Sequence, residues 1–441
     1  RPLGPRAFLF QLRERHVDKF VIRGGVALRG DVEVGTAKNS VLPILAATLL
    51  TKEPCRILDV PRLRDVATMT RILGALGVEC TREEDGSIAT RVTDDSAIEA
   101  PYQLVKTMRA SVCTLGPLLA ARGRARVSFP GGCVFGPRPI DLHLKGLRAL
   151  GAELDIEGGY IVARADRLRG TGIYLGGPFG PTVTGTANVL MAAVLADGVT
   201  HIDMAACEPE VQDLANFLVE MGADVRGIGT PTLEVHGVRE LHGATYRPVP
   251  DRIEAGTYLA AAAITGGTVK VKRCRPDHLR AVIERLTTIG CNVQVGPDWV
   301  TVARRGRIQA ADITTLAYPG FPTDLQAQFM ALLSLADGVS VVTEKIYPER
   351  FMHVAELARM RARVRREQNL AIVVGSDFLS GAPVLASDLR ASAALVLAGL
   401  VAEGETQVRR VYHIDRGYDR IEEKLAGLGA RIERVKDEEA P

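Results

Sequence analysis

A four-residue turn motif recurs six times along this 441-residue chain. Its third position falls at residues 77, 151, 222, 290, 361 and 429, and this position holds glycine in every copy except Arg361. Successive copies are therefore about 70 residues apart over the whole chain. A period this regular indicates that one supersecondary unit is repeated six times.

Each repeat has the same internal order. It begins with a run of small apolar residues that favours a helix, as at 258–264, 329–336 and 393–402. A short β-like run follows, as at 269–271 and 339–342, and then an amphipathic helix, as at 278–289. Most of the apolar helices are expected to stop at a glycine just past their last turn, namely at Gly123, Gly198, Gly266, Gly338 or Gly404.

Six such units predict an α/β protein with two lobes of three units each, because a chain of this length exceeds what one hydrophobic core usually organises. Solenoid repeats have periods of a similar order and are the alternative. However, the apolar first helices lack the polar face that solenoid helices expose. They are therefore predicted to lie inside a shell of sheets, three helices to each lobe.

The copies differ most where the apolar helices begin, and charged residues gather there. The six starts are Lys38–Asn39, Arg109, Thr184, Asp251–Arg252, Asp324 and Asp388–Arg390. Internal symmetry would bring three of these helix N-termini together in each lobe, where their free N–H groups favour an anion. We therefore expect a phosphorylated ligand between the lobes. The alternative is that these charges cap helices or face solvent, and capping suits Asp324 and Asp388.

Composition and motifs exclude several classes of protein. The net charge is only +3, so no global field calls for nucleic acid or an acidic membrane. No apolar run approaches the roughly 20 residues that span a bilayer, and neither a P-loop nor a dinucleotide-binding glycine motif is present. The seven cysteines form no CxxC pair and no metal-ligand spacing. We expect a cytoplasmic protein with free thiols and no metal or other cofactor, in which residues 1–17, lacking a secretory signal, form an N-terminal extension.

Five segments, in order along the chain, resemble one family of enzymes. They are Ala37-Lys38-Asn39, Lys106–Ser111, Pro130–Pro139, Phe321–Asp324 and His413–Tyr418. Residues 18–436 as a whole are similar to the UDP-N-acetylglucosamine 1-carboxyvinyltransferases. The resemblance implies two inside-out α/β barrels, each of threefold internal symmetry. It also implies that one lobe spans residues 39–248 and the other spans residues 18–38 plus 249–437, with a hinge between them that closes on the ligands.

The family resemblance also implies a reaction. Members move the enolpyruvyl group of phosphoenolpyruvate onto the 3′-hydroxyl of UDP-N-acetylglucosamine and release phosphate, which is the first committed step of peptidoglycan synthesis. The hydroxyl attacks C2 of phosphoenolpyruvate while C3 takes a proton, and phosphate then leaves. The expected protein is a monomeric enzyme that binds these two small molecules and has neither nucleic acid nor a membrane as partner.

The matched motifs imply roles for individual residues. Cys133 corresponds to the family's reactive cysteine, and cations such as Arg138 would lower the pKa of its thiol. Asp324 corresponds to the proposed base, and Lys38 and Arg416 complete the catalytic set. The implied phosphoenolpyruvate contacts are Lys38, Asn39, Arg138, Arg350, Arg390 and Arg416. The implied UDP-N-acetylglucosamine contacts are Asn39, Arg109, Arg138, Pro139, Ile140, Asp141, Leu142, Thr182, Val183, Asp324 and Ile346.

Three positions depart from the family pattern. Gly180 aligns where many relatives have a lysine that contacts the nucleotide. Arg361 replaces the glycine of the other five turns, and we expect a locally altered turn because a left-handed arginine costs about 1 kcal/mol or more. Cys207 occupies a position that is often arginine. Like the other cysteines outside the 130–139 loop, it is expected to be structural.

Three other functions stay open. The sister enzyme that makes 5-enolpyruvylshikimate 3-phosphate has the same fold, but the cysteine loop at 130–139 argues against it. An enolpyruvyl transferase acting on a free nucleotide in antibiotic synthesis is kept open by Gly180. A non-catalytic paralogue that binds UDP-sugars would be expected to have lost Cys133, Asp324 or a phosphate-binding arginine, and all are present.

Overall fold

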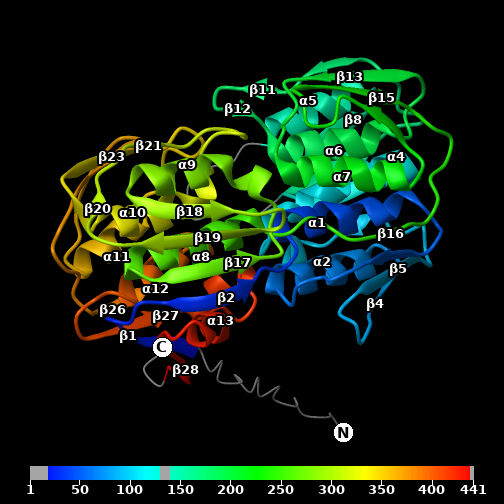
Figure 1. Cartoon of the computed structure of the whole chain (residues 1–441). Helices are drawn as coiled ribbons and strands as arrows, with labels where there is room; N and C mark the ends of the chain where they lie inside the picture. Colours follow the sequence, from blue (N-terminus) through cyan, green and yellow to red (C-terminus); the bar gives the residue numbers. More distant parts are fainter. Residues whose placement is uncertain (1–17, 130–139, 438–441) are drawn as a thin grey trace, which may run out of the picture.

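The computed structural model describes residues 18–129 and 140–437 (Figure 1). Its buried apolar side chains form two separate clusters. The first core draws on residues between Val41 and Leu241, and the second core on residues 20–34 together with residues 253–432. Figure 1 shows the elements of the first core on one side of the molecule and those of the second core on the other.

Six four-stranded sheets in the described part of the chain share one strand arrangement. In one of them, β6 (Glu99–Ala100) pairs in parallel with β7 (Arg124–Ser128). Strand β9 (Tyr160–Arg164) then pairs antiparallel with β7 on one side and with β8 (Glu153–Glu157) on the other. The same order of one parallel and two antiparallel pairings in every sheet confirms the prediction of six repeated units.

The remaining strands are distributed evenly between the cores. The other two sheets over the first core contain β16 (Thr245–Tyr246), β3 (Cys55–Ile57), β5 (Ile88–Val92) and β4 (Val78–Arg82), and β10 (Gly172–Tyr174), β13 (Val199–Asp203), β15 (Thr232–His236) and β14 (Asp224–Arg226). The second core has β18 (Cys291–Val295), β19 (Trp299–Arg304), β17 (Thr268–Lys272) and β2 (Arg29–Glu33); β21 (Ile313–Thr314), β23 (Val339–Thr343), β25 (Leu370–Val374) and β24 (Arg363–Glu367); and β26 (Pro383–Leu385), β27 (Glu405–Arg409), β1 (Asp18–Arg23) and β28 (Arg431–Lys436). Two small ribbons pair β11 (Gly176–Gly177) with β12 (Gly180–Pro181), and β20 (Ile308–Gln309) with β22 (Ala336–Asp337).

The chain passes between the cores twice, along two segments that lie side by side. Strands β1 and β2 belong to sheets of the second core, whereas the next elements belong to the first. The return passage follows β16. Ala37 N–H donates to Val249 O at 2.7 Å, Asp251 N–H donates to Gly35 O at 2.8 Å, and Thr36 bridges antiparallel to Pro250. The two passages therefore form one hydrogen-bonded ribbon between the cores.

Two kinds of helix accompany each sheet, as the repeat predicts. The helices α8 (Arg252–Thr265), α10 (Gln326–Leu333) and α12 (Ala391–Gly399) are almost entirely buried and pack on one another, and α1 (Lys38–Ala47), α4 (Leu115–Arg122) and α6 (Val183–Ala193) are their counterparts in the first core. Their alanines and glycines permit this close packing. The amphipathic helices, each with a buried and an exposed face, are α2 (Arg64–Ala75), α5 (Asp141–Ala149), α7 (Pro209–Glu220), α9 (Arg280–Thr288), α11 (His353–Arg359) and α13 (Ile421–Gly427). A short α3 (Tyr102–Val105) precedes β7.

The prediction that a glycine follows the last turn of each buried helix is confirmed in two cases. Gly123 and Gly266 directly follow α4 and α8 in the left-handed conformation, with φ of 65° and 69°. The prediction is wrong for Gly198, Gly338 and Gly404, because α6, α10 and α12 end several residues earlier. Those three glycines also have positive φ, but they turn the chain into the next strand.

Arg361 contradicts the prediction of an altered turn. Its φ is 69°, in the same left-handed region as the glycines of the other five repeats. The turn keeps its hydrogen bonds, since Arg361 N–H donates to Ala358 O and Ala362 N–H to Leu357 O, both at 3.0 Å. The guanidinium lies 4.7 Å from the centroid of the Phe378 ring. We attribute the tolerance of arginine here to this cation–π contact, which offsets part of the backbone strain.

None of the helices in the described ranges, 18–129 and 140–437, is both long and apolar enough to cross a membrane.

Candidate active site

The predicted catalytic residues Lys38 and Arg416 lie together, and a buried carboxylate joins them. Lys38 is the first residue of α1, and its Nζ lies 3.0 Å from Asp65 Oδ2. Arg416 ends a 3-10 helix, Val411–Arg416, beside the second core, and its Nε donates to Asp65 Oδ1 at 2.9 Å. Asp65 itself lies in the first turn of α2. One carboxylate of the first core therefore holds a cation of each core.

The charge state of Asp65 follows from these contacts. Burial raises the pKa of its carboxyl, but Lys38 and Arg416 outweigh burial, so the net pKa lies below the usual value. Asp65 is thus ionised near neutral pH and neutralises part of the charge of its two partners. The sequence reading missed this residue, and only its place in the first turn of an amphipathic helix could have suggested it.

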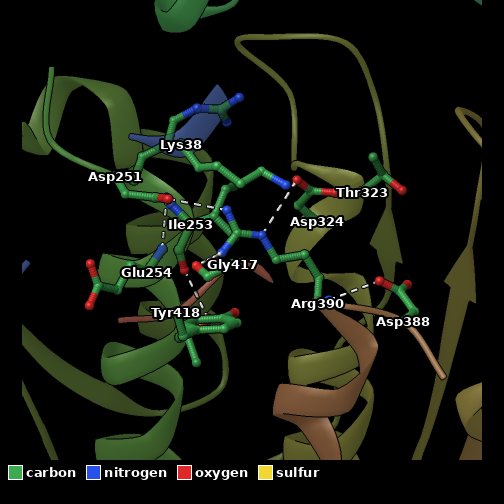
Figure 2. Close-up of polar contacts among 12 residues, drawn as sticks. Lys38, Asp251, Ile253, Glu254, Thr323, Asp324, Asp388, Arg390, Gly417 and Tyr418 are labelled. Carbon is green, nitrogen blue, oxygen red and sulfur yellow. Dashed lines mark hydrogen bonds and ion pairs between the residues drawn. The ribbon is translucent and has the colours of Figure 1, made fainter. Parts of the chain in front are cut away.

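A second cluster surrounds Asp324 (Figure 2). Arg350 Nη1 lies 2.6 Å from Asp324 Oδ1, and Arg390 Nε lies 3.8 Å from Asp324 Oδ2. Arg390 also contacts Asp251 Oδ2 at 3.1 Å and donates to Gly417 O at 3.0 Å. Both arginines are almost fully buried, whereas the Asp324 side chain is 25% exposed. Asp324 is therefore a partly exposed carboxylate beside two buried arginines.

The ionisation of Asp324 suits the role of proton acceptor. Burial raises the pKa of its carboxyl, but Arg350, then Arg390 and the charge of Lys38 lower it far more, so that the net pKa is well below the usual value. The carboxylate is charged at neutral pH and carries no proton. The capping alternative is wrong for Asp324, because the 3-10 helix Thr323–Leu325 follows Pro322 without a side-chain cap.

Helix N-termini converge in the second core as the repeat predicts. Asp251 caps α8 by accepting from Ile253 N–H and Glu254 N–H at 2.8 and 3.0 Å, and the same side chain meets Arg390 at the start of α12. Asp324 lies just before α10. Figure 2 shows Lys38, which begins α1 of the first core, reaching toward Asp324. The cations around these N-termini form a site suited to phosphate and carboxylate groups.

The predicted nucleotide-sugar residues of the first core gather at the starts of α5 and α6. Asp141 and Leu142 begin α5, Ile140 precedes it, and Thr182 caps α6 before Val183 by accepting from Gly185 N–H at 3.2 Å. Leu142 packs on the β11–β12 ribbon, since its side chain lies 3.0 Å from where a Cβ on Gly177 would be. Asp141 and Val183 are exposed, Leu142 and Thr182 are half-buried, and Ile140 is buried beneath them.

A buried histidine joins α5 and α6. Asn188 Nδ2 donates to His143 Nδ1 at 3.0 Å, which leaves Nε2–H to donate to Thr184 Oγ1 at 3.1 Å. Burial, and to a lesser extent the charge of Arg109, lowers the pKa of His143 to about 3. Arg109 begins a 3-10 helix that packs against α1 and α6. This neutral histidine therefore fixes the relative position of the two helix starts.

The remaining predicted residues are spread over both cores or lie outside the structure. Asn39, the second residue of α1, is exposed. Ile346 follows β23 in the second core, and its N–H donates to Glu344 Oε1 at 2.8 Å. Cys133, Arg138 and Pro139 lie outside the described residues, so their predicted roles stay predictions.

Comparison with known proteins identifies the family. The family model of EPSP synthase (3-phosphoshikimate 1-carboxyvinyltransferase) matches residues 22–425. A UDP-N-acetylglucosamine 1-carboxyvinyltransferase from Methylacidiphilum infernorum (isolate V4) is 52% identical over 420 residues, which cover 95% of this chain and 99% of that protein. The chain belongs to the UDP-N-acetylglucosamine 1-carboxyvinyltransferase family.

Solved structures agree with this transferase in fold. The enolpyruvyl transferase NikO from Streptomyces tendae superposes with a TM-score of 0.85 at 24% identity, covering 97% of this chain and 100% of NikO. An EPSP synthase from Acinetobacter baumannii has a TM-score of 0.72 at 18% identity, covering 95% of this chain and 100% of that one. This transferase therefore has the mixed α/β fold of the enolpyruvyl transferases.

The two other departures of this transferase have different surroundings. Gly180 has φ of 92° in the β11–β12 ribbon, and no atom lies within 4 Å of a Cβ built on it. A lysine would have room there but would meet an unfavourable backbone conformation. Cys207 is half-buried, and its pKa is raised by burial and then by Glu208. The six described cysteines all have raised pKa values, mainly because of burial, and are poor nucleophiles.

Proposed function

We propose that this protein transfers the enolpyruvyl group of phosphoenolpyruvate to the 3′-hydroxyl of UDP-N-acetylglucosamine with release of phosphate, the first committed step of peptidoglycan synthesis. The observation that carries the proposal is the 52% identity to a protein of that name over 95% of the chain. The charge clusters around Asp65 and Asp324 support it, because the reaction needs cations for two anionic substrates and a carboxylate base.

In the proposed reaction Asp324 takes the proton of the sugar 3′-hydroxyl while the hydroxyl oxygen bonds to C2 of phosphoenolpyruvate. The thiol of Cys133 supplies the proton to C3. Loss of phosphate and of a proton from C3 then regenerates the double bond. Lys38, Arg350, Arg390 and Arg416 hold the phosphate and carboxylate, joined by Asn39 and Arg138. The ionised state of Asp324 supports its role, since a protonated carboxyl could not act as base.

The basicity of Asp324 would depend on the substrate. Arg350 lies 2.6 Å from its Oδ1 and stabilises the carboxylate. A phosphate group that draws Arg350 toward itself would weaken this ion pair and raise the pKa of Asp324. The base would then become stronger only when phosphoenolpyruvate is bound. This coupling would limit proton abstraction to the complex that contains both substrates.

The sugar nucleotide would lie against the first core, in contact with the remaining residues proposed for it: Arg109, Pro139, Ile140, Asp141, Leu142, Thr182, Val183 and, from the second core, Ile346. We further propose two inside-out α/β barrels, with residues 39–248 in one lobe and residues 18–38 plus 249–437 in the other. The two separate cores and the repeated sheets support this division. The protein is proposed to act in the cytoplasm as a monomer.

Phosphate release tests the proposal directly. Phosphoenolpyruvate is supplied with UDP-N-acetylglucosamine, UMP or shikimate 3-phosphate, for the wild type and for Cys133→Ser. Rapid release only with the UDP-sugar, lost in the variant, is expected. The epoxide antibiotic fosfomycin should add once to Cys133, as read by intact mass. An unmodified Cys133 in an enzyme that turns over would remove its proposed role.

A second function is favoured by one observation, the glycine at position 180. Release of phosphate with UMP alone would indicate an enolpyruvyl transferase that acts on a free nucleotide in antibiotic biosynthesis. If no phosphate is released with any of the three acceptors while the UDP-sugar still binds, the protein is a non-catalytic UDP-sugar-binding paralogue.

A further inference from the structure

A pocket of about 360 Å³ lies at the ribbon where the chain passes between the cores. Its lining includes Gly35 and Thr36 of the first passage. The first core contributes Arg62, Arg82 and the segment 59–63, and the second core contributes Arg273, Asp419, Arg420 and Lys424. This volume is in the range of small-molecule sites. Among the described residues assigned above to the two substrates, none lines it.

The carboxylates of the pocket already have partners. Asp59 Oδ2 lies 2.7 Å from Arg247 and 3.0 Å from Arg273. Glu254 binds Lys424 Nζ at 2.6 Å and accepts from Gly35 N–H at 2.9 Å. Asp419 accepts the backbone N–H of Arg62 at 3.2 Å. The negative charge of the lining is therefore largely neutralised.

Two guanidinium groups of the first core are not neutralised in this way. Across the described ranges, no carboxylate lies within 4.0 Å of the guanidinium of Arg62 or of Arg82. Within the part of the chain that the structure describes, Arg82 donates only to the carbonyl groups of Val60, Pro61 and Gly86, at 2.8, 3.3 and 3.1 Å. Arg62 and Arg82 both line the pocket. Burial, and then the charge of Arg62, lowers the pKa of Arg82. With five cationic and three acidic side chains, the lining has a positive balance.

The walls of the pocket continue directly into the candidate active site. Thr36 is two residues before Lys38, Leu63 is two residues before Asp65, and Gly417 follows Arg416. Each member of the Lys38–Asp65–Arg416 cluster is thus held by a segment that also lines the pocket.

We propose that this pocket is a second anion-binding site, which takes a small multivalent anion such as a diphosphate between Arg62 and Arg82 of the first core and Arg420 of the second. Arg420 also pairs with Glu423 at 3.1 Å and with Asp419 at 3.6 Å, so Arg62 and Arg82 are the main ligands of the anion. Arginine suits this role because its planar group can donate two hydrogen bonds to one phosphate. A ligand held by both cores stabilises their relative position and, through the shared segments, the arrangement of Lys38 and Arg416. The site is independent of the identity of the sugar acceptor.

Calorimetric titration of inorganic pyrophosphate into the full chain tests the site, at about 0.1 M salt so that long-range charge is screened. The protein is first saturated with UDP-N-acetylglucosamine to occupy the acceptor part of the active site. The phosphoenolpyruvate part is the same in the test and control variants, so pyrophosphate bound there does not contribute to the difference between them. The binding of UDP-N-acetylglucosamine is measured in a separate titration. If the protein does not bind this sugar nucleotide, the proposed function is wrong, and this result is distinguished from a failure of the pyrophosphate site. The test variant is Arg62→Ala/Arg82→Ala. The matched control, Arg71→Ala/Arg91→Ala, removes two exposed arginines of the first core that do not line the pocket.

We expect the test variant to bind pyrophosphate at least tenfold more weakly than the wild type, and the control to bind within twofold of it. The single variant Arg62→Glu, at an exposed side chain, should lose binding and keep the thermal unfolding midpoint of the free protein. Absence of pyrophosphate binding to the wild type would overturn the proposal. Equal weakening in the test and control variants would also overturn it, because net charge alone would then explain the effect.

Discussion

Replacing Asp65 by asparagine tests the link between the two cores most directly. The change keeps the size of the side chain and removes one negative charge. Lys38 Nζ at 3.0 Å and Arg416 Nε at 2.9 Å then lose their common partner. The Lys38 and Asp65 side chains are 7% and 5% exposed, so little water can replace the lost interaction at Lys38.

The expected size of the effect follows from this burial. Removing one partner of a buried ion pair costs about 3–5 kcal/mol, because the other charge stays buried. Arg416 is 28% exposed and can be partly hydrated, so we expect the lower end, about 3 kcal/mol. The pKa of Asp65 is lowered on folding. Its stabilising contribution is therefore present above the unfolded value near 3.8 and is lost as pH falls below it.

Urea unfolding of the free protein at pH 7 and at pH 3.5 measures this contribution. The control is Asp95→Asn, which breaks the ion pair between Asp95 and Lys52. The side chains of Asp95 and Lys52 are 56% and 78% exposed. The control should cost far less stability than Asp65→Asn, because exposed ion pairs are screened by solvent. The kcat/KM for phosphoenolpyruvate should fall about 100-fold in Asp65→Asn, since small displacements of reacting groups are this costly. If the two variants lose equal stability at pH 7, or if kcat/KM is unchanged, Asp65 does not hold the two cations in place.

Three further substitutions test other parts of the molecule. Asp324→Asn should lower kcat for phosphate release at least about 100-fold, whereas Asp337→Asn, at a carboxylate that is 67% exposed, should leave it unchanged. Arg361→Gly should change the free energy of unfolding by less than about 1 kcal/mol, because relief of the left-handed strain is offset by loss of the Phe378 contact and by greater freedom of the unfolded chain. Calorimetry would contradict us by showing a larger change. Folding lowers the pKa of His143 from 6.5 to about 3. The contribution of neutral His143 to the free energy of unfolding is therefore complete above pH 6.5 and is lost as pH falls toward 3. His143→Gln should therefore flatten the fall in stability between pH 6.5 and 4, and an unchanged slope in thermal unfolding would refute this.

Local periodicity explains which parts of the fold could be predicted. The six turns, the buried helices such as α8 and the short strands recur because each repeat must bury the same apolar surface. The predictions for Arg361 and Gly404 were wrong because a local sequence rule was overridden by a tertiary contact in one case and by an earlier turn of the chain in the other. Arg361 keeps a glycine conformation because Phe378 lies beside it, and Gly404 is not the end of α12 because the chain turns earlier.

The candidate site divides in the same way. Residue type and motif were enough to single out Lys38, Asp324 and Arg416, since anionic substrates require cations and a base wherever the chain places them. The partners of those residues could not be derived from the sequence. Asp65 and Arg416 are 351 positions apart, and Arg390 and Asp251 are 139 apart. Such pairs depend on how distant segments pack within and between the two cores. The same packing creates the pocket beside Arg62 and Arg82, which no sequence motif predicts. A motif reports the chemistry of one segment, whereas charge pairing and cavity shape arise only when distant segments meet.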